Sequence, residues 1–264
     1  MSKLVLLTLT LMLLFAVSFP ACGPVPMPKG AYTHAPDLLA AMSKKRQGFD
    51  SFRISGRVDH FGKAQHIRGK LFLFAQFPKN LRVDLLSPFG NTLSVLTVAD
   101  GRFAMADYRE GVFMEGAAEP CNIARLIKIP LPAEEVIRIL IGDSPIIEGT
   151  SEVSWDKKGF YRVEVRDGER IQTLEINPDK DILSLKRSLL KDSRGIVYDI
   201  RYDRWRRVNS AYVPYEIRVK VPSDQTDLEL LYDDDGVETD IELPSDAWSL
   251  SFPKGADIKQ AVCR

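Results

Sequence analysis

The sequence has few of the residues from which catalytic and metal sites are built. Its 264 residues include only three histidines and three cysteines, and the cysteines are too far apart for a zinc-type ligand spacing. It has no glycine-rich phosphate loop, no Gly-x-Ser-x-Gly elbow, no His-Glu-x-x-His motif and no Cys-x-x-Cys pair. We therefore expect no metal, no cofactor and no enzymatic activity.

Neither sign of charge is in excess. The 36 lysines and arginines balance 36 aspartates and glutamates, so the formal net charge is zero. A neutral chain lacks the positive field that attracts polyanions, which argues against a nucleic-acid partner. The content of 45% hydrophobic and 27% charged residues is ordinary for a globular protein and excludes a disordered chain or a fibre.

The amino terminus has the three-part layout of an export signal. Lys3 gives a positive start, residues 4–19 form a run of sixteen uncharged and mostly apolar residues, and Ala21 directly precedes Cys22. Sixteen helical residues reach about 24 Å, which is short of the roughly 30 Å hydrocarbon core of a bilayer. We therefore expect residues 1–21 to be a removable signal peptide.

A small residue followed directly by cysteine resembles the lipobox of bacterial lipoproteins, in which that cysteine becomes the acylated amino terminus. The resemblance implies that Cys22 is a lipid anchor, and Gly23 after it implies sorting to the outer membrane. The alternative is an ordinary signal cut near Ser18, which leaves Cys22 as a free thiol. Three prolines follow within a few residues and disfavour regular structure, so we expect residues 22–35 to be an extended, lipidated tether.

The remaining residues, 36–264, predict one mainly β domain with a few helices. Apolar and charged residues alternate over 81–85, 161–165 and 215–221, so one face of each strand should meet water. Turn signals such as Asp-Gly recur about every 10 residues, a spacing typical of antiparallel hairpins. We expect about ten or eleven strands.

One predicted strand needs a cover. Residues 71–74 read Leu-Phe-Leu-Phe and are apolar on both faces. The segment 120–142 supplies apolar residues at helical spacing, interrupted by Pro130 and Pro132. Two short helices from this segment could lie over one face of a curved sheet, or they could simply complete its core.

Three short stretches make the chain similar to a known family. Residues 85–92 read Leu-Leu-Ser-Pro-Phe-Gly-Asn-Thr, and about forty residues later come Lys-Ile-Pro-Leu-Pro at 128–132 and Ile-Leu-Ile-Gly at 139–142. Together they resemble the LolB family of outer-membrane lipoprotein receptors. The resemblance implies an incomplete, curved antiparallel β-barrel whose concave face is covered by short helices around an apolar cavity.

The family resemblance also implies a function. The chain would be a lipid-anchored protein of the outer membrane that faces the periplasm, takes acyl chains of lipoproteins from a LolA-like carrier and helps insert them. The alternative is a lipoprotein of the same fold whose apolar space is filled by its own side chains, and which acts as a structural or partner-binding subunit of an envelope assembly. The candidate cavity residues are Phe72, Phe74, Leu126, Ile127, Ile137, Leu140 and Ile141.

The loop after residue 85 matches the protruding family loop that is needed for membrane delivery. Leu86, Pro88 and Phe89 are its candidate residues, and Phe89 stands where the family has an exposed leucine. A phenylalanine that moves from water into lipid gains roughly 1.5 to 3 kcal/mol, which favours contact with a bilayer without anchoring the protein. The alternative is a buried turn residue that caps the core.

Two cysteines remain if Cys22 is acylated. Cys121 and Cys263 would lie in an oxidising compartment, where disulfides persist. A bridge between them would close a loop of about 140 residues and add at most roughly 5 kcal/mol in the chain-entropy description. The sequence gives no distance between them, so their pairing stays open.

Overall fold

The computed structural model describes residues 24–46, 50–62, 66–127, 129–179, 182–244 and 246–263. The predicted signal peptide 1–21 and the predicted anchor Cys22 lie outside the described residues. Within the described part, no helix combines the length and the apolar character needed to span a bilayer.

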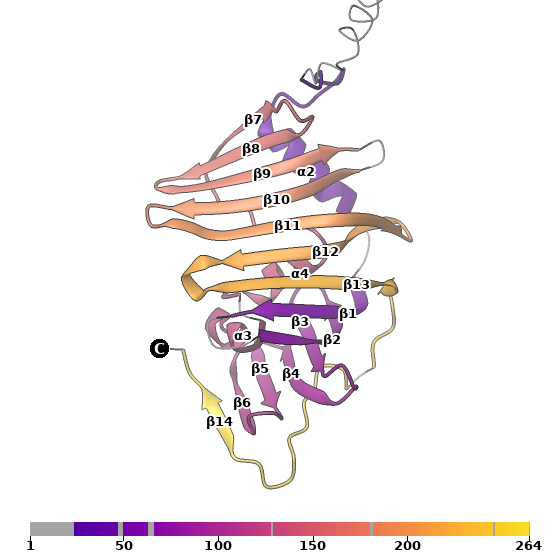
Figure 1. Cartoon of the computed structure of the whole chain (residues 1–264), viewed down its shortest axis with the longest axis vertical. Coiled ribbons are helices and arrows are strands. Elements are labelled where there is room, and N and C mark those ends of the chain that lie inside the picture. The colour runs from indigo at the N-terminus through magenta and orange to yellow at the C-terminus, as the bar shows by residue number, and fades with distance from the viewer. Residues whose placement is uncertain are drawn as a thin grey trace, which may run out of the picture.

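The described strands form one open, curved sheet (Figure 1). Its order is β14-β6-β5-β4-β3-β2-β1-β13-β12-β11-β10-β9-β8-β7, and each printed pair of neighbours is antiparallel except β14 with β6. One half of the sheet contains β1 (Ser51–Phe61), β2 (His66–Gln76), β3 (Asn80–Leu86), β4 (Thr92–Ala99), β5 (Arg102–Asp107), β6 (Val112–Ala117), β13 (Thr226–Thr239) and β14 (Ile258–Ala261).

The other half of the sheet continues from β13 toward the edge strand β7. It contains β7 (Thr150–Trp155), β8 (Tyr161–Asp167), β9 (Arg170–Pro178), β10 (Leu183–Asp192), β11 (Gly195–Val208) and β12 (Ala211–Val221), and the 3-10 turn η1 (Pro222–Asp224) joins β12 to β13.

The predicted fold class is confirmed, but the predicted number of strands was too low. The described residues form 14 strands, where the sequence led us to expect ten or eleven. Two of the described strands give a weak signal in the sequence: β6, in which five of six residues are half-buried, and β14, which has four residues. Such segments carry no alternation of apolar and charged residues, so the period-two signal misses them.

Alternation decides which side chains enter the core. In β8, Tyr161, Val163 and Val165 are buried, whereas Arg162 and Arg166 between and beyond them are exposed. Successive side chains of a strand point to opposite faces, so the apolar set of each strand lies on the inner face of the curved sheet.

Three helices cover this inner face (Figure 1). Helix α2 (Ala35–Arg46) contacts β7, β10 and β12 and buries Leu38 and Met42. Helix α3 (Pro120–Ile127) contacts β4 and β5, and helix α4 (Ala133–Leu140) contacts β3. The cover is therefore divided between the two halves of the sheet.

The two ends of the described chain pack at opposite edges of the sheet, near the edge strands β7 and β14. The Val25 amide donates to the Lys157 carbonyl at 3.1 Å, and the Trp155 indole donates to the Val25 carbonyl at 2.9 Å, so part of the predicted tether lies against the turn after β7. At the other edge, Cys121 and Cys263 form a disulfide with Cα atoms 5.9 Å apart. The bridge that the sequence left open is therefore present, and it ties α3 to the segment after β14.

Candidate functional site

A small apolar cavity lies between the sheet and helices α3 and α4. Its volume is about 70 Å³. Strands β1, β2, β3 and β13 form one wall, and the last turn of α3 together with α4 forms the other. Every lining residue is Val, Leu or Ile: Val58, Leu71, Leu73, Val83, Leu85, Leu126, Ile127, Val136, Leu140, Leu228 and Leu230.

The register between β2 and β3 determines which side chains form the sheet side of the cavity wall. Leu71 lies directly opposite Leu85, and Leu73 lies opposite Val83, in the antiparallel pair of β2 and β3. Opposite residues share a face, so these four side chains project into the same space. The cavity is large enough for a few methylene groups, since an engineered apolar cavity of about 150 Å³ holds one benzene.

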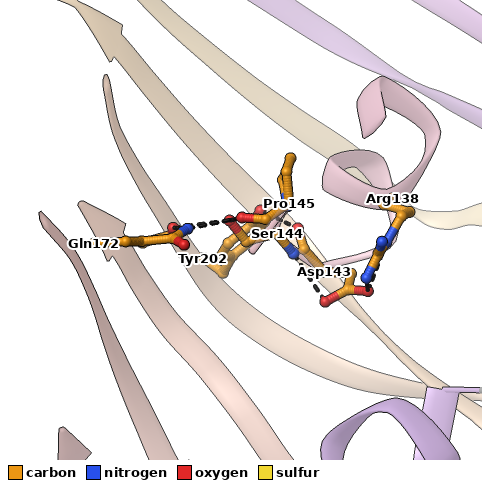
Figure 2. Close-up of polar contacts among 7 residues, drawn as sticks. Arg138, Asp143, Ser144, Pro145, Gln172 and Tyr202 are labelled. Carbon is orange, nitrogen blue, oxygen red and sulfur yellow. Dashed lines mark hydrogen bonds and ion pairs between the residues drawn. The ribbon is translucent and has the colours of Figure 1, made fainter. Parts of the chain in front are cut away.

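The carboxyl end of α4 is fixed to the sheet. The Tyr232 hydroxyl donates to the Leu140 carbonyl at 2.9 Å, and burial raises the pKa of Tyr232 far above its ordinary value, so the group is a neutral donor. Gly142 follows with φ of +85°, and any side chain there would meet the Trp205 ring. Residue Arg138 of α4 donates to the Asp143 carboxylate at 2.8 and 3.0 Å (Figure 2).

A buried polar cluster holds the loop that follows α4 (Figure 2). The Gln172 side-chain nitrogen lies 2.7 Å from the Pro145 carbonyl and 3.0 Å from the hydroxyls of both Ser188 and Tyr198. Burial raises the pKa of Tyr198, and hydrogen bonds with Ser188 and Ser144 offset this only in part. The cluster satisfies its buried polar groups and positions the loop, so its role is structural.

Helix α3 is fixed from its beginning as far as Arg125. The Asn122 side chain donates to the Ala261 carbonyl at 3.4 Å, and the Arg125 guanidinium donates to the Val262 carbonyl at 3.2 Å. These contacts add to the disulfide at Cys121. The last turn of α3, which lies over the cavity, is only half-buried. It is therefore the least enclosed part of the cavity wall.

The predicted delivery loop projects from the domain. The Gly90 amide donates to the Ser87 carbonyl at 2.9 Å, and the Ser87 amide donates to the Asn91 carbonyl at 2.8 Å, which closes a tight turn. Phe89 at its tip is 92% exposed, so the buried-turn alternative is wrong. The turn directly follows β3, whose Leu85 lines the cavity.

The structure separates the predicted cavity residues into three groups. Leu126, Ile127 and Leu140 line the cavity. Ile137 and Ile141 are buried without being among its lining residues.

Phe72 and Phe74 lie on the other face of the sheet, because they alternate with the inward Leu71 and Leu73. Phe72 lies opposite Asp84 and borders an outer-surface hollow with Leu250. The sequence did carry a signal for this. If β2 and β3 are paired through the turn at 77–79, the two phenylalanines fall opposite the charged residues of β3.

Sequence reasoning also missed the strand side of the cavity wall. It did not name Val58, Val83, Leu228 or Leu230. Among the described residues, the candidate group of metal ligands is Glu119 with Cys121 and Cys263, and the two sulfur atoms of that group are bonded to each other.

Comparisons with known proteins include a related sequence. No protein-family profile matches the chain. The outer-membrane lipoprotein LolB of Hamiltonella defensa is 36% identical over 93 residues, which are 35% of this chain and 43% of that protein. The match thus spans less than half of the length of this curated relative.

Solved structures extend the comparison to the whole fold. A DUF1329-family protein from Desulfovibrio piger has a TM-score of 0.56 at 12% identity, over 81% of this chain and 95% of that one. A LolA-superfamily protein from Nitrosomonas europaea has a TM-score of 0.52 at 12% identity, over 83% and 99%. The chain therefore shares the fold of these two structures, one of which is a LolA-superfamily protein. Over the 93 matched residues, its sequence is similar to that of a LolB protein.

Proposed function

We propose that this protein is a lipid-anchored lipoprotein of the outer membrane, facing the periplasm, that takes acyl chains of other lipoproteins into its cavity and helps insert them into the membrane. The observation that carries the proposal is the position of the all-aliphatic cavity directly beside the exposed Phe89 loop, with strand β3 contributing to both. The related protein is by its name an outer-membrane lipoprotein, which supports the same location.

An apolar wall is sufficient for the transfer. Each acyl methylene group removed from water contributes about 0.8 kcal/mol, so one sixteen-carbon chain represents on the order of 12 kcal/mol. Aliphatic side chains can replace water around such a chain without chemistry. Release then requires only a deeper apolar phase, the bilayer itself, and the proposed activity is transfer rather than catalysis.

Loading requires the cavity to expand, because about 70 Å³ is far less than one acyl chain occupies. We place the movement in the last turn of α3. The beginning of α3 is held by the disulfide at Cys121, Arg125 is held to the Val262 carbonyl, and the end of α4 is held by Tyr232, so the half-buried Leu126 and Ile127 are the least restrained part of the wall. Its displacement would widen the cavity, which is already partly open to the surface.

In this proposal, anchoring and delivery belong to different residues. The acyl chains on Cys22 hold the protein at the membrane, and Phe89 contacts the bilayer when a client is released. A soluble LolA-like carrier is the proposed donor of the client lipoprotein.

A transfer assay tests the delivery loop and the cavity together. Purified protein, a carrier loaded with a labelled lipoprotein, and vesicles are mixed, and the label in the vesicle fraction is measured. Phe89→Glu should abolish delivery, and Val136→Phe, which fills the cavity, should abolish loading. Ile196→Glu, at a position that is 41% exposed in β11 of the other half of the sheet, is the matched control and should transfer normally. Unchanged transfer by Phe89→Glu with normal folding would rule out the loop.

The anchor is tested separately. Cys22→Ala should move the protein from the membrane fraction to the soluble periplasmic fraction, and mass spectrometry of the native amino terminus should show an acylated cysteine. A Cys22→Ala protein that remains firmly in the membrane fraction would refute the anchor.

A further inference from the structure

Exposed aromatic side chains gather at neighbouring turns of the sheet. Phe61 is 53% exposed at the end of β1, Phe89 is 92% exposed between β3 and β4, and Tyr108 is 40% exposed between β5 and β6. Because β1 to β6 are consecutive antiparallel strands, every second turn emerges at the same end of the sheet. These three turns are therefore on one end, and we call their three side chains the aromatic rim.

Contacts between the strands bring the rim residues together. Lys70 near the β1–β2 turn lies opposite Leu86, the last residue before the Phe89 loop. On the other side of the loop, the Tyr108 amide donates to the Leu93 carbonyl at 2.9 Å. Leu86, Thr92 and Tyr108 also border one hollow of the outer surface.

The cavity is at the same end of the strands. Leu85 is the next-to-last residue of β3, and Val58 lies three residues before Phe61. Leu228, which also lines the cavity, is paired with His60, the neighbour of Phe61. The aromatic rim therefore lies at the end of the sheet that Leu85, Val58 and Leu228 of the cavity wall approach.

We propose that the aromatic rim is a three-point contact surface for a lipid bilayer, so that Phe61 and Tyr108 insert beside Phe89. This inference rests on the proposed function and extends it from one loop to three turns. One inserted side chain leaves a domain free to rotate, whereas three points fix its orientation with the cavity facing the lipid.

The chemistry of the rim fits a bilayer better than a protein partner. Its three exposed side chains belong to separate turns, where Phe61 stacks on His66 and Tyr108 packs edge-on against Phe113. A stable protein interface needs a contiguous surface of roughly 800 Å² on each partner. Phenylalanine and tyrosine are suited to the boundary between acyl chains and headgroups. Exposed Lys70 lies on the same end, where it can meet anionic headgroups.

The proposal is tested by measuring the depth of each rim position in a bilayer. Phe61→Trp, Phe89→Trp and Tyr108→Trp are made in the full chain and mixed with phosphatidylethanolamine and phosphatidylglycerol vesicles whose acyl chains carry bromine at a shallow position. Val262→Trp is the control. Val262 is 65% exposed and follows β14, so it lies at the end of the sheet opposite to the aromatic rim. Native tryptophans give the same background in all four proteins.

All three rim tryptophans should be quenched by the brominated lipid, and the control should not. Quenching at position 89 alone would overturn the rim and leave a single inserting loop. If emission at 61 and 108 responds to a soluble lipoprotein carrier and not to vesicles, the surface binds protein and the lipid assignment is overturned.

Charged substitutions give a second readout. Phe61→Glu and Tyr108→Glu should each weaken vesicle contact about tenfold, as expected for losing insertion of a partly exposed aromatic side chain. Client transfer is measured on the same samples. If clients are transferred although positions 61 and 108 do not insert, the rim proposal is overturned and the proposed function stands. If all three positions insert but no client is transferred, the proposed function is overturned and the rim proposal stands.

Discussion

In both halves of the sheet, inward apolar residues alternate with outward polar residues along the strands. The interiors of the two halves are nevertheless different. In the half of β7 to β12 under α2, the described interior side chains are well buried: Leu174 and Ile176 are completely buried, and a hydrogen-bonded cluster around Gln172 lies under the loop after α4. The half of β1 to β6 with β13, under α3 and α4, encloses an aliphatic cavity of about 70 Å³. We call these the solid half and the hollow half.

The difference comes from side-chain length and from hydroxyl groups. The solid half presents Tyr198, Tyr202 and Tyr215 to its interior, and the hydroxyl of Tyr202 reaches across to donate to the Asp143 carbonyl. The cavity wall of the hollow half contains only Val, Leu and Ile, which are shorter and have no polar end to fix to a partner. An apolar space between shorter side chains can stay dry, and the side chains that line it form no hydrogen bonds with one another that would resist its widening.

The largest expected effect is the loss of stability when a core leucine is truncated to alanine, and this loss should differ between the two halves. Leu174→Ala, at a fully buried position in the solid half, should lower the free energy of unfolding by about 4 kcal/mol. Leu71→Ala, whose side chain already borders the cavity, should cost only about 2 kcal/mol, because it has fewer partner atoms to lose. Denaturant titration measures both, and equal losses would contradict the distinction between the halves.

A smaller effect tests the buried polar cluster. Gln172→Leu should lower the free energy of unfolding by about 1 to 3 kcal/mol, because the Tyr198 hydroxyl and the Pro145 carbonyl lose a buried partner. Gln260→Leu on exposed β14 is the matched control and should stay within about 0.5 kcal/mol of the native protein. A neutral Gln172→Leu would mean that the cluster does not hold the loop.

The smallest effect is an opposite response of two aspartates to acid. Burial raises the pKa of Asp199 in the solid half, but hydrogen bonds from Arg187 and Arg201 outweigh it and hold the pKa below the ordinary 3.8. Burial of Asp84 in the hollow half is only partly offset by Arg82, so its pKa is raised. Asp199 thus stabilises the fold at neutral pH, and this contribution is lost as the pH falls below about 4. The charged form of Asp84 is unfavourable in the fold, and acid relieves that cost as the pH falls through its raised pKa.

Unfolding measured at a series of pH values separates the two groups. At neutral pH, Asp199→Asn should be less stable than the native protein and Asp84→Asn more stable, and both differences should shrink on acidification, because a protonated carboxyl resembles the amide. Differences of the same sign at neutral pH would show that the sign assigned to one of the groups is wrong.

The sequence predicts the fold better than it predicts the site. Alternation in 161–165 and 215–221 locates β8 and β12, and the interrupted helical pattern of 120–142 locates α3 and α4. Residues Leu126 and Ile127 follow from that helical pattern, and both line the cavity.

The strand side of the cavity depends on which face of β2 turns inward. Residues 71–74 are apolar on both faces, so composition cannot distinguish Leu71 from Phe72, and only pairing with β3 decides it. The polar cluster was not predicted either. Gln172 looks like an ordinary polar residue of a strand, and it is buried only because a loop distant in sequence folds over it.

The central claim is that the hollow half opens to hold an acyl chain, and one titration tests it directly. The purified protein is titrated with a fluorescent sixteen-carbon acyl probe and compared with Val136→Phe, whose added ring fills the cavity wall at a buried position. We expect saturable binding of the probe to the native protein and at least a tenfold loss in the variant, with the free energy of unfolding nearly unchanged. No binding to the native protein, or equal binding to both, would contradict the claim and favour a structural or partner-binding subunit of the same fold.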